Sequence, residues 1–100
     1  MSQPYTLLHP LTLDAKGAAL VGLQQDDRIT EVTLRRAIGS DLKLIDRFRD
    51  KPIELTLNMI AKLSGIDLYV VEKFDAEDIG PLGDLAMASS PNGQSIGATA

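Results

Sequence analysis

The sequence predicts an α+β domain in which a small antiparallel N-terminal sheet is followed by two to four helices packed on one face of it. Two observations predict this class. Of the 100 residues, 44% are apolar, which is enough for a single hydrophobic core. The alternation typical of strands also gives way, after residue 40, to the spacing typical of helices. We expect one domain over residues 1–88 and a disordered, polar, Gly-rich tail over residues 89–100.

The first quarter of the chain predicts the start of the sheet. Tyr5–His9 begins an extended stretch, and Pro10 inside it indicates an edge strand or a bulge, because proline has no N–H to donate to a neighbouring strand. Residues 14–17 are interpreted as a turn in which Gly17 supplies a positive φ. Residues 18–23 then predict a second strand.

Residues 29–36 predict the next strand, because apolar and polar side chains alternate along them. The residues expected on one face are Thr30, Val32 and Leu34. The opposite face carries Glu31, Thr33 and Arg35. This pattern is typical of a half-buried antiparallel strand.

Helical spacing begins after Gly39. Ser40 or Asp41 is a suitable N-cap for a short helix whose apolar side chains stand at i, i+3 and i+6. These side chains are Leu42, Ile45 and Phe48.

A longer helix is predicted over Pro52–Leu63, with proline in its first turn and Gly65 as the left-handed residue after its end. Its polar residues form one narrow stripe, made by Glu54, Asn58 and Lys62. The apolar arc is about twice as wide as the ~100° of an ordinary surface helix. We therefore expect this helix to be buried on two sides, by its own domain or by a partner.

The last third predicts shorter elements. Residues 67–72 are interpreted as a short helix or an extended connector, and Asp75 as the N-cap of a final helix. Gly80, Pro81 and Gly83 interrupt the pattern of that helix, so we expect it to be broken or short.

Composition argues against several classes of function. The net charge is −4 and the pI about 4.7, so the basic footprint of a nucleic-acid binder is missing, and an anionic membrane surface would repel the chain. No apolar run approaches ~18 residues, and no signal-peptide pattern is present, so we expect no membrane association. The absence of cysteine excludes a disulfide scaffold.

Catalytic and metal-binding patterns are also missing. His9 is the only histidine, and it has no cysteine or second histidine with which to form a metal site. The sequence contains no EF-hand, nucleophile-elbow, dinucleotide-binding or P-loop pattern. We therefore expect no enzymatic activity, no cofactor and no metal.

Residues 60–74 allow an alternative interpretation, a helix-turn-helix DNA-binding regulator. The small, turn and core positions of that motif would be Ala61, Gly65, Ile66 and Val71. Its recognition helix would offer Asp67, Leu68, Tyr69 and Glu72 to the DNA, with Lys73 as its one basic residue. Phosphates and base edges favour Arg, Lys, Asn or Gln, which weighs against this alternative.

Five segments follow one another along residues 5–88. They are Pro10–Leu11, Ile29–Arg35, Gly39–Leu42, Leu57–Ile66 and Phe74–Ile79. In this order and spacing they resemble the small tail assembly chaperones of long-tailed phages and prophages, of the Mu-like tail protein class.

The resemblance implies a non-enzymatic function in the cytoplasm of the bacterial host. Such proteins are thought to bind the long, helical, hydrophobic tape measure protein and keep it soluble until tail tube subunits polymerise around it. The sequence leaves open the phage, the host, the oligomer number and whether a frameshifted longer form exists.

The wide apolar helix is the predicted partner-binding element, since an apolar helix face can pair with a helix of the tape measure protein. The residues expected to bind are Ile53, Leu55, Met59 and Leu63, on the side of the helix predicted to be least needed by its own core. We also expect a homo-oligomer that buries the same apolar arc until the partner arrives.

Overall fold

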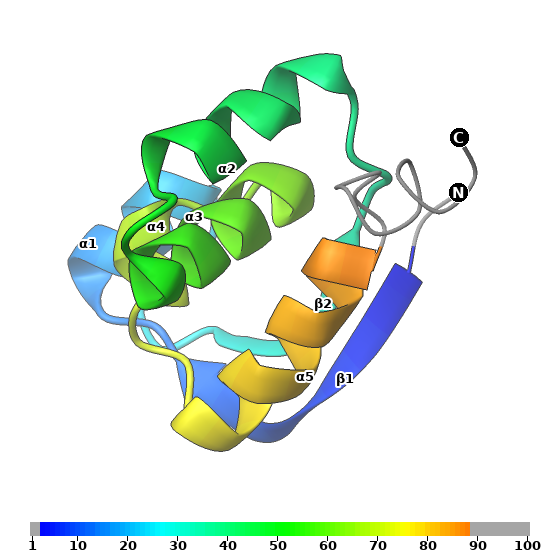
Figure 1. Cartoon of the computed structure of the whole chain (residues 1–100). Helices are drawn as coiled ribbons and strands as arrows, with labels where there is room; N and C mark the ends of the chain where they lie inside the picture. The colour runs from blue at the N-terminus through cyan, green and yellow to red at the C-terminus, as the bar shows by residue number, and fades with distance from the viewer. Residues whose placement is uncertain (1–2, 89–100) are drawn as a thin grey trace.

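Two strands and five α-helices make up residues 3–88, the part of the chain that the computed structural model describes (Figure 1). In chain order the elements are β1 (Gln3–Thr12), α1 (Ala15–Val21), β2 (Arg28–Leu34), the 3₁₀-helix η1 (Gly39–Asp41), α2 (Leu42–Arg47), α3 (Pro52–Ser64), α4 (Leu68–Val71) and α5 (Ala76–Ala88). The predicted α+β class with an antiparallel N-terminal sheet is confirmed. The tail predicted over residues 89–100 lies outside the described residues.

The sheet consists of β1 and β2, and β2 corresponds to the strand predicted over residues 29–36. Val32 and Leu34 are buried, as the alternation predicts. Thr30 was expected on the same face, but it is exposed, and Ile29 is buried instead. The alternation changes phase here because the pairing between the two strands is interrupted.

A bulge in β1 causes this interruption. Thr6 pairs with Glu31 and Leu11 pairs with Ile29, so four residues of β1 face a single residue of β2. Pro10 lies within the bulge, where its missing N–H costs no ladder hydrogen bond. The bulge takes backbone N–H groups of β1 out of the ladder, and these groups need other partners.

Asp78 of α5 supplies those partners. Its buried carboxylate accepts hydrogen bonds from the N–H of Leu8 at 2.7 Å, the N–H of His9 at 3.0 Å and the hydroxyl of Tyr5 at 2.9 Å. Burial alone would raise the pKa of Asp78, but these hydrogen bonds outweigh it and the pKa is lowered. The first turn of α5 is thereby fixed to β1.

The segment after β1 is a helix, which corrects the prediction of a turn and a second strand over residues 14–23. Asp14 caps α1 by accepting the N–H of Gly17 at 2.7 Å, and its second carboxylate oxygen accepts the Tyr69 hydroxyl at 2.8 Å. Gly22, at φ 76°, ends the helix in the left-handed conformation that was assigned to Gly17. The alanine-rich sequence between the two caps favours a helix over a strand.

A second buried carboxylate joins β2 to the helices. Arg35 donates two hydrogen bonds to Asp41, at 2.9 and 3.1 Å, and the N–H of Ile38 donates a third at 2.7 Å. The bonds from Arg35 lower the pKa of Asp41 more than burial raises it. Asp41 is the N-cap residue of α2, one of the two alternatives predicted, but its side chain binds Arg35 and Ile38 and makes no capping hydrogen bond to α2.

The central element is α3, which contacts α2, α4, α5 and β2. Its own domain thus accounts for most of the wide apolar arc, one of the two explanations that the sequence left open. Pro52 lies in its first turn and Gly65 ends it at φ 75°, as predicted. Residues 68–71 form the single-turn helix α4, which settles the choice between a helix and a connector.

The last helix, α5, is continuous over 13 residues, whereas the sequence predicted a broken or short one. Gly80 precedes Pro81 and has no Cβ to clash with the proline ring, so the chain stays helical there. Leu82 and Ala86 are fully buried, and their packing favours the intact helix. Gly83 is needed for close packing on α3, because a Cβ added there would lie 2.7 Å from Cγ2 of Thr56.

The contact between α3 and α5 gives a first prediction. Gly83→Ala should lower the free energy of unfolding, because overpacking costs about 1–3 kcal/mol and exceeds the ~1 kcal/mol gained in helix propensity. Thr56→Ser removes Cγ2 and should restore part of the loss in the double variant, as measured by urea unfolding. Gly39→Ala is the control, since its new Cβ meets no atom within 4 Å. Equal stabilities of Gly83→Ala and the wild type would contradict the tight contact.

The Asp78 hydrogen bonds give a second prediction. Asp78→Ala should cost more than about 2 kcal/mol, because two backbone N–H groups lose a buried acceptor at about 1–3 kcal/mol each. Asp84→Ala, at an exposed position of the same helix, should cost less than about 0.5 kcal/mol. Because the folded-state pKa of Asp78 is lowered, its stabilisation is present above the ordinary value of 3.8 and is lost as the pH falls further. Urea titrations in which the difference from wild type fails to shrink below that pH would refute this assignment.

Candidate functional site

The four residues predicted to bind a partner do not share one exposed face. Ile53 is 74% exposed and Leu55 is half-buried, whereas Met59 and Leu63 expose 0% and 2%. The premise that all four lie on a side not needed by the core is therefore wrong for Met59 and Leu63. A helical wheel gives the width of an apolar arc but does not tell which part of it the rest of the domain covers.

Ile53 lies at the rim of a cavity of about 290 Å³ between α3 and α5, which we name the α3–α5 groove. Its lining residues are Ile53, Thr56, Ile79, Gly80, Gly83, Asp84 and Met87. Ile53 was predicted from the sequence, whereas the residues of α5 were not, because that helix was expected to be broken or short.

Two features of the sequence shape the α3–α5 groove. Gly80 has no side chain and faces open space, whereas Gly83 lets α5 lie close to Thr56 of α3 at the other part of the groove. The hydroxyl of Thr56 donates to the carbonyl of Pro52 at 2.9 Å, so its hydrogen-bonding requirement is met within α3. Around these residues the groove offers mainly apolar side chains.

The chemistry of the α3–α5 groove is suited to binding. Asp84 is the one ionisable side chain among its lining residues, and the groove contains neither a paired acid and base nor a nucleophile with an adjacent base. It can accept apolar side chains of a partner helix, with Ile53 adding contact area at the rim.

Further large apolar side chains are exposed on other elements. They are Leu8, Leu20, Leu23 and Ile38. They lie on β1, on and after the end of α1, and in the connection that follows β2, and isolated exposed apolar residues of this kind are ordinary on protein surfaces. Ile53 is among the residues that line a cavity.

The helix-turn-helix interpretation of residues 60–74 does not fit the structure. The turn at Gly65 is present, but the helix after it, α4, has only four residues. Val70 and Val71 of that helix are fully buried, and Asp67 accepts the N–H of Tyr69 as its N-cap. A single buried turn cannot lie in a DNA major groove as a recognition helix does.

One cluster within residues 3–88 has the composition of a metal site. The side chains of His9, Asp75 and Glu77 are exposed and place one possible ligand atom each within 4.8 Å of the others. Hydrogen bonds within the fold already account for this arrangement: Nε2 of His9 lies 2.6 Å from Glu77, and Asp75 accepts the N–H of Glu77 as the predicted N-cap of α5. The sequence could not show the cluster, because β1 and α5 lie far apart along the chain.

Comparison with known proteins gives one match. The sequence model of the family described as phage tail assembly chaperone proteins, E, or 41 or 14, matches residues 5–90. No curated protein and no solved structure matches the chain. Among the described residues, no helix has the length and apolar character needed to span a membrane.

The His9–Glu77 contact gives a third prediction. The hydrogen bond to Glu77, helped by the charge of Asp75, raises the pKa of His9 above its ordinary 6.5. Its stabilisation is therefore complete below pH 6.5 and is lost as the pH rises through the folded-state pKa. Glu77→Gln should lower the pKa of His9 in an NMR titration, and Glu72→Gln, a change at an exposed residue of the preceding turn, is the control. An unchanged titration in Glu77→Gln would show that the pair does not form in solution.

Proposed function

The chain belongs to the family of phage tail assembly chaperone proteins, and we propose that it binds the tape measure protein and keeps it soluble during tail assembly. The family match over residues 5–90 is the observation that carries this proposal, because it includes nearly all the described residues. The binding takes place in the cytoplasm of the bacterial host, where the tail components are made. The function requires no catalysis.

The α3–α5 groove is the proposed contact with the tape measure protein. A helical, hydrophobic partner presents apolar side chains at i, i+3, i+4 and i+7, and one of them can enter a cavity of about 290 Å³. Burying one large aliphatic side chain contributes about 1.5–3 kcal/mol. Several chaperone molecules along a long partner would then cover a large apolar surface.

The four residues of α3 divide into two roles in this proposal. Ile53 touches the partner directly, whereas Leu55 is half-buried, packs against the core and is not among the residues that line the groove, so it supports α3. Met59 and Leu63 contribute by holding α3 in place, since both are core residues. Substitutions at Met59 or Leu63 therefore act on stability first and on binding only as a consequence.

The acidic composition supports the solubilising role. A net charge of −4 on each chaperone favours solubility of the complex and opposes non-specific aggregation of the apolar partner. The apolar arc of α3 leaves little exposed surface beyond Ile53 for the homo-oligomer that the sequence predicted. Self-association therefore requires another surface.

A co-expression experiment tests the proposal. Ile53→Asp should reduce the recovery of soluble tape measure protein about tenfold, the effect of losing roughly 1.4 kcal/mol of binding free energy. Leu23→Asp places the same charge on an exposed apolar residue outside the α3–α5 groove and should leave recovery unchanged. Thermal unfolding of both variants should match the wild type, because neither position is buried.

Two results would count against the proposal. Undiminished co-purification of the tape measure protein with Ile53→Asp would exclude the α3–α5 groove as the contact. A tape measure protein that stays insoluble beside well-folded wild-type chaperone would argue against the function itself.

A further inference from the structure

We propose that the cleft between α2 and α3 receives the acidic end of a second copy of this chain, so that copies associate head to tail. The cleft is lined by Ser40, Lys43, Leu44, Arg47 and Lys62, and we name it the basic cleft. The acidic end consists of Asp75, which precedes α5, and Glu77 in its first turn, together with the exposed Leu8 of β1. This contact uses neither the α3–α5 groove nor the tape measure protein and does not rest on the function proposed above.

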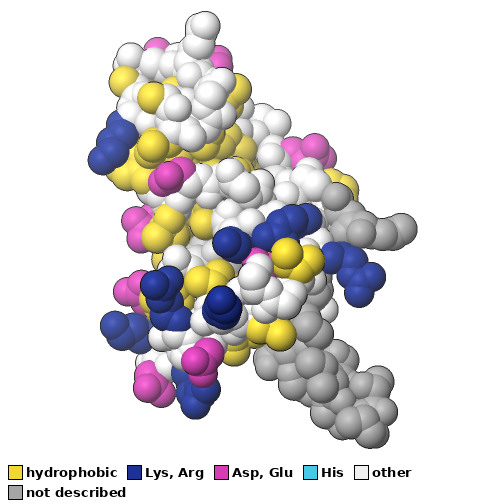
Figure 2. All heavy atoms as spheres, turned by 90° about the horizontal axis from the view of Figure 1, so that it is seen from above, with side chains coloured by type: hydrophobic (Ala, Val, Ile, Leu, Met, Phe, Trp, Pro, Cys, Tyr) yellow, Lys and Arg dark blue, Asp and Glu magenta, His cyan; other side chains and the backbone are white. Residues whose placement is uncertain are grey.

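Charge is segregated along the chain. Residues 35–62 contain seven Lys or Arg and four Asp or Glu, a net charge of +3, although the whole chain carries −4. The remaining residues contain three Lys or Arg and ten Asp or Glu, a net charge of −7. Figure 2 views the molecule from the side on which α2 lies, where dark blue Lys and Arg side chains are interspersed with magenta Asp and Glu and with apolar side chains. The segment that carries α2 and α3 is thus net positive in an otherwise acidic protein.

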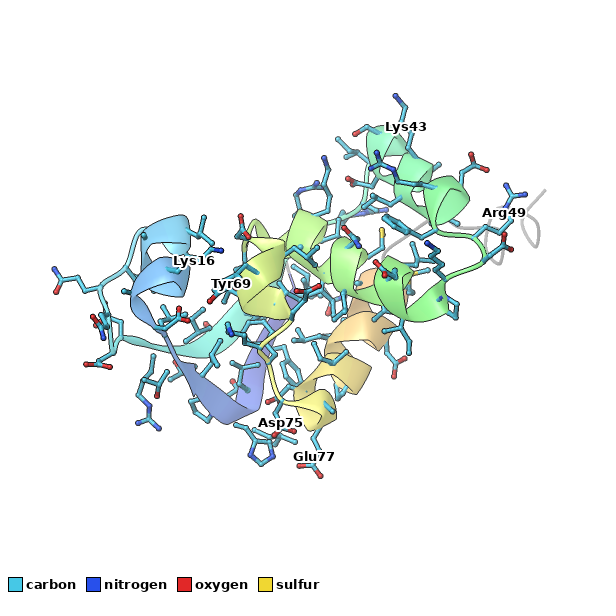
Figure 3. All side chains as sticks on the ribbon, turned by 90° about the vertical axis from the view of Figure 1, so that its left-hand side faces the viewer. Lys16, Lys43, Arg49, Tyr69, Asp75 and Glu77 are labelled. Atoms are coloured by element: carbon cyan, nitrogen blue, oxygen red, sulfur yellow. The ribbon has the colours of Figure 1, made fainter. Side chains whose placement is uncertain are left out.

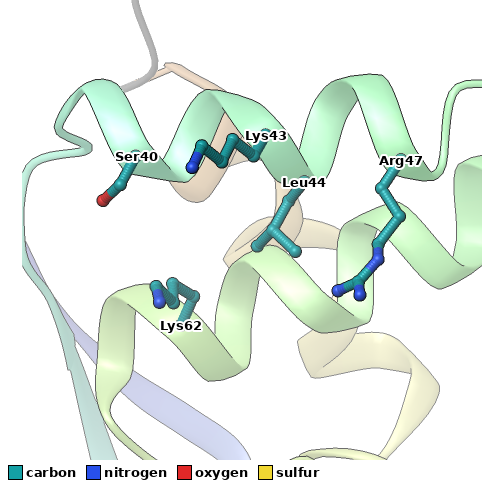
Figure 4. Close-up of a pocket in the computed structure, with 5 residues that line it drawn as sticks. All are labelled: Ser40, Lys43, Leu44, Arg47 and Lys62. Carbon is teal, nitrogen blue, oxygen red and sulfur yellow. The ribbon is translucent and has the colours of Figure 1, made fainter.

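The basic cleft is large enough to receive side chains of another molecule. It has a volume of about 500 Å³, and no Asp or Glu is among its lining residues. Figure 4 shows Lys43 and Lys62 close to Ser40 at one end, Arg47 at the other end, and Leu44 pointing down between them. Leu44 packs against the core. An apolar centre is therefore flanked by positive charges on both sides.

Lys43 and Arg47 form no ion pair among residues 3–88, whereas the charge of Lys62 acts on the buried Asp41 carboxylate. Asp41 is buried and bound bidentately by Arg35, and Asp46 pairs with Arg49. The guanidinium of Arg47 lies 5.9 Å from the ring of its neighbour Phe48, a contact that leaves its charge in place. The ion pairs of the same segment thus leave Lys43 and Arg47 available to carboxylates from outside, while Lys62 lies beside them and also acts on Asp41.

The acidic end is complementary to the basic cleft. Asp75 and Glu77 are exposed, and each uses only one carboxylate oxygen within the described residues, for the N–H of Glu77 and the ring of His9 respectively. Leu8, which precedes His9, exposes 65% of its surface. The acidic end therefore combines negative charges with an exposed apolar side chain, and the basic cleft combines positive charges with an apolar centre.

The two surfaces cannot meet within one molecule. Figure 3 shows Asp75 and Glu77 at one end of the molecule and Lys43 at the opposite end, and Figure 1 places the start of α5 and α2 in the same way. The acidic end of one copy can reach the basic cleft only on another copy. Such a contact joins two different surfaces, so each copy can bind one neighbour through its basic cleft and another through its acidic end. Repeating this contact produces a closed ring or an open filament. Opposite charges also set the register of the contact and disfavour other orientations.

Sedimentation velocity at two ionic strengths tests this inference. At about 0.01 M salt, where the Debye length is ~30 Å, the wild-type sedimentation coefficient should rise with protein concentration, and at about 1 M salt, where it is ~3 Å, the rise should vanish. The basic-cleft variant Lys43→Glu/Arg47→Glu should associate at least tenfold more weakly. The acidic-end variant Asp75→Asn/Glu77→Lys keeps a capping side chain for α5 and should show the same loss.

Mixing the two variants is the decisive measurement. Each variant retains one wild-type surface, so the mixture should associate again although neither variant does so alone. This recovery also shows that both variants are folded. The control Lys16→Glu/Arg28→Glu changes the net charge as much as the basic-cleft variant does, but away from the basic cleft, and should still associate.

Three outcomes would overturn the inference. Wild-type protein that stays monomeric at low salt and high concentration has no head-to-tail contact. Full association of the basic-cleft variant would place the interface elsewhere. The wild type could also fail to self-associate while the basic-cleft variant recovers less tape measure protein in the co-expression experiment. That result would show that the basic cleft binds acidic side chains of the tape measure protein instead. Co-expression of Ile53→Asp with the tape measure protein distinguishes these three outcomes from failure of the proposed function, because this substitution leaves the basic cleft unchanged.

Discussion

The hydrogen bonds between Asp78 and the bulge of β1 are the constraint on which the remaining structure depends. A bulge that releases N–H groups into the interior would destabilise a two-stranded sheet unless a buried acceptor bound them. Asp78 provides that acceptor from the first turn of α5, so one carboxylate stabilises the sheet and also fixes the helix against it. The position of α5 then determines the α3–α5 groove, since that groove exists only where α5 meets α3.

Close packing and open space alternate along α5 because of two glycines, Gly80 and Gly83. Gly83 brings the helix so near to Thr56 that even a methyl group would clash, while Gly80, one turn earlier, faces open space. The same pair of glycines thus fixes the distance between the helices and leaves room for a ligand between them. A larger residue at either position would change the shape of the groove as well as the stability of the fold.

Local signals were sufficient for much of the fold. The strand at β2, the start of α3 at Pro52 and its end at Gly65 follow from alternation, from a fixed φ and from a left-handed cap. The turn predicted at Asp14 and Gly17 was wrong, because the same residue types that begin a turn also cap a helix. The continuity of α5, the burial of Met59 and Leu63, and the cluster of His9 with Asp75 and Glu77 all depend on contacts distant in the chain. No periodicity in a single sequence contains that information.

The two proposed contacts have a joint consequence. The first turn of α5 carries the acidic end and the rest of the same helix lines the α3–α5 groove, so a head-to-tail contact at one turn fixes the orientation of the groove beside it. Copies joined in this way would repeat the groove at regular intervals, and a long helical partner repeats its apolar side chains in the same manner. Each groove could then bind with modest affinity, because the grooves already bound hold the partner near the next one at a high effective concentration. Many weak contacts of this kind can also be released one at a time.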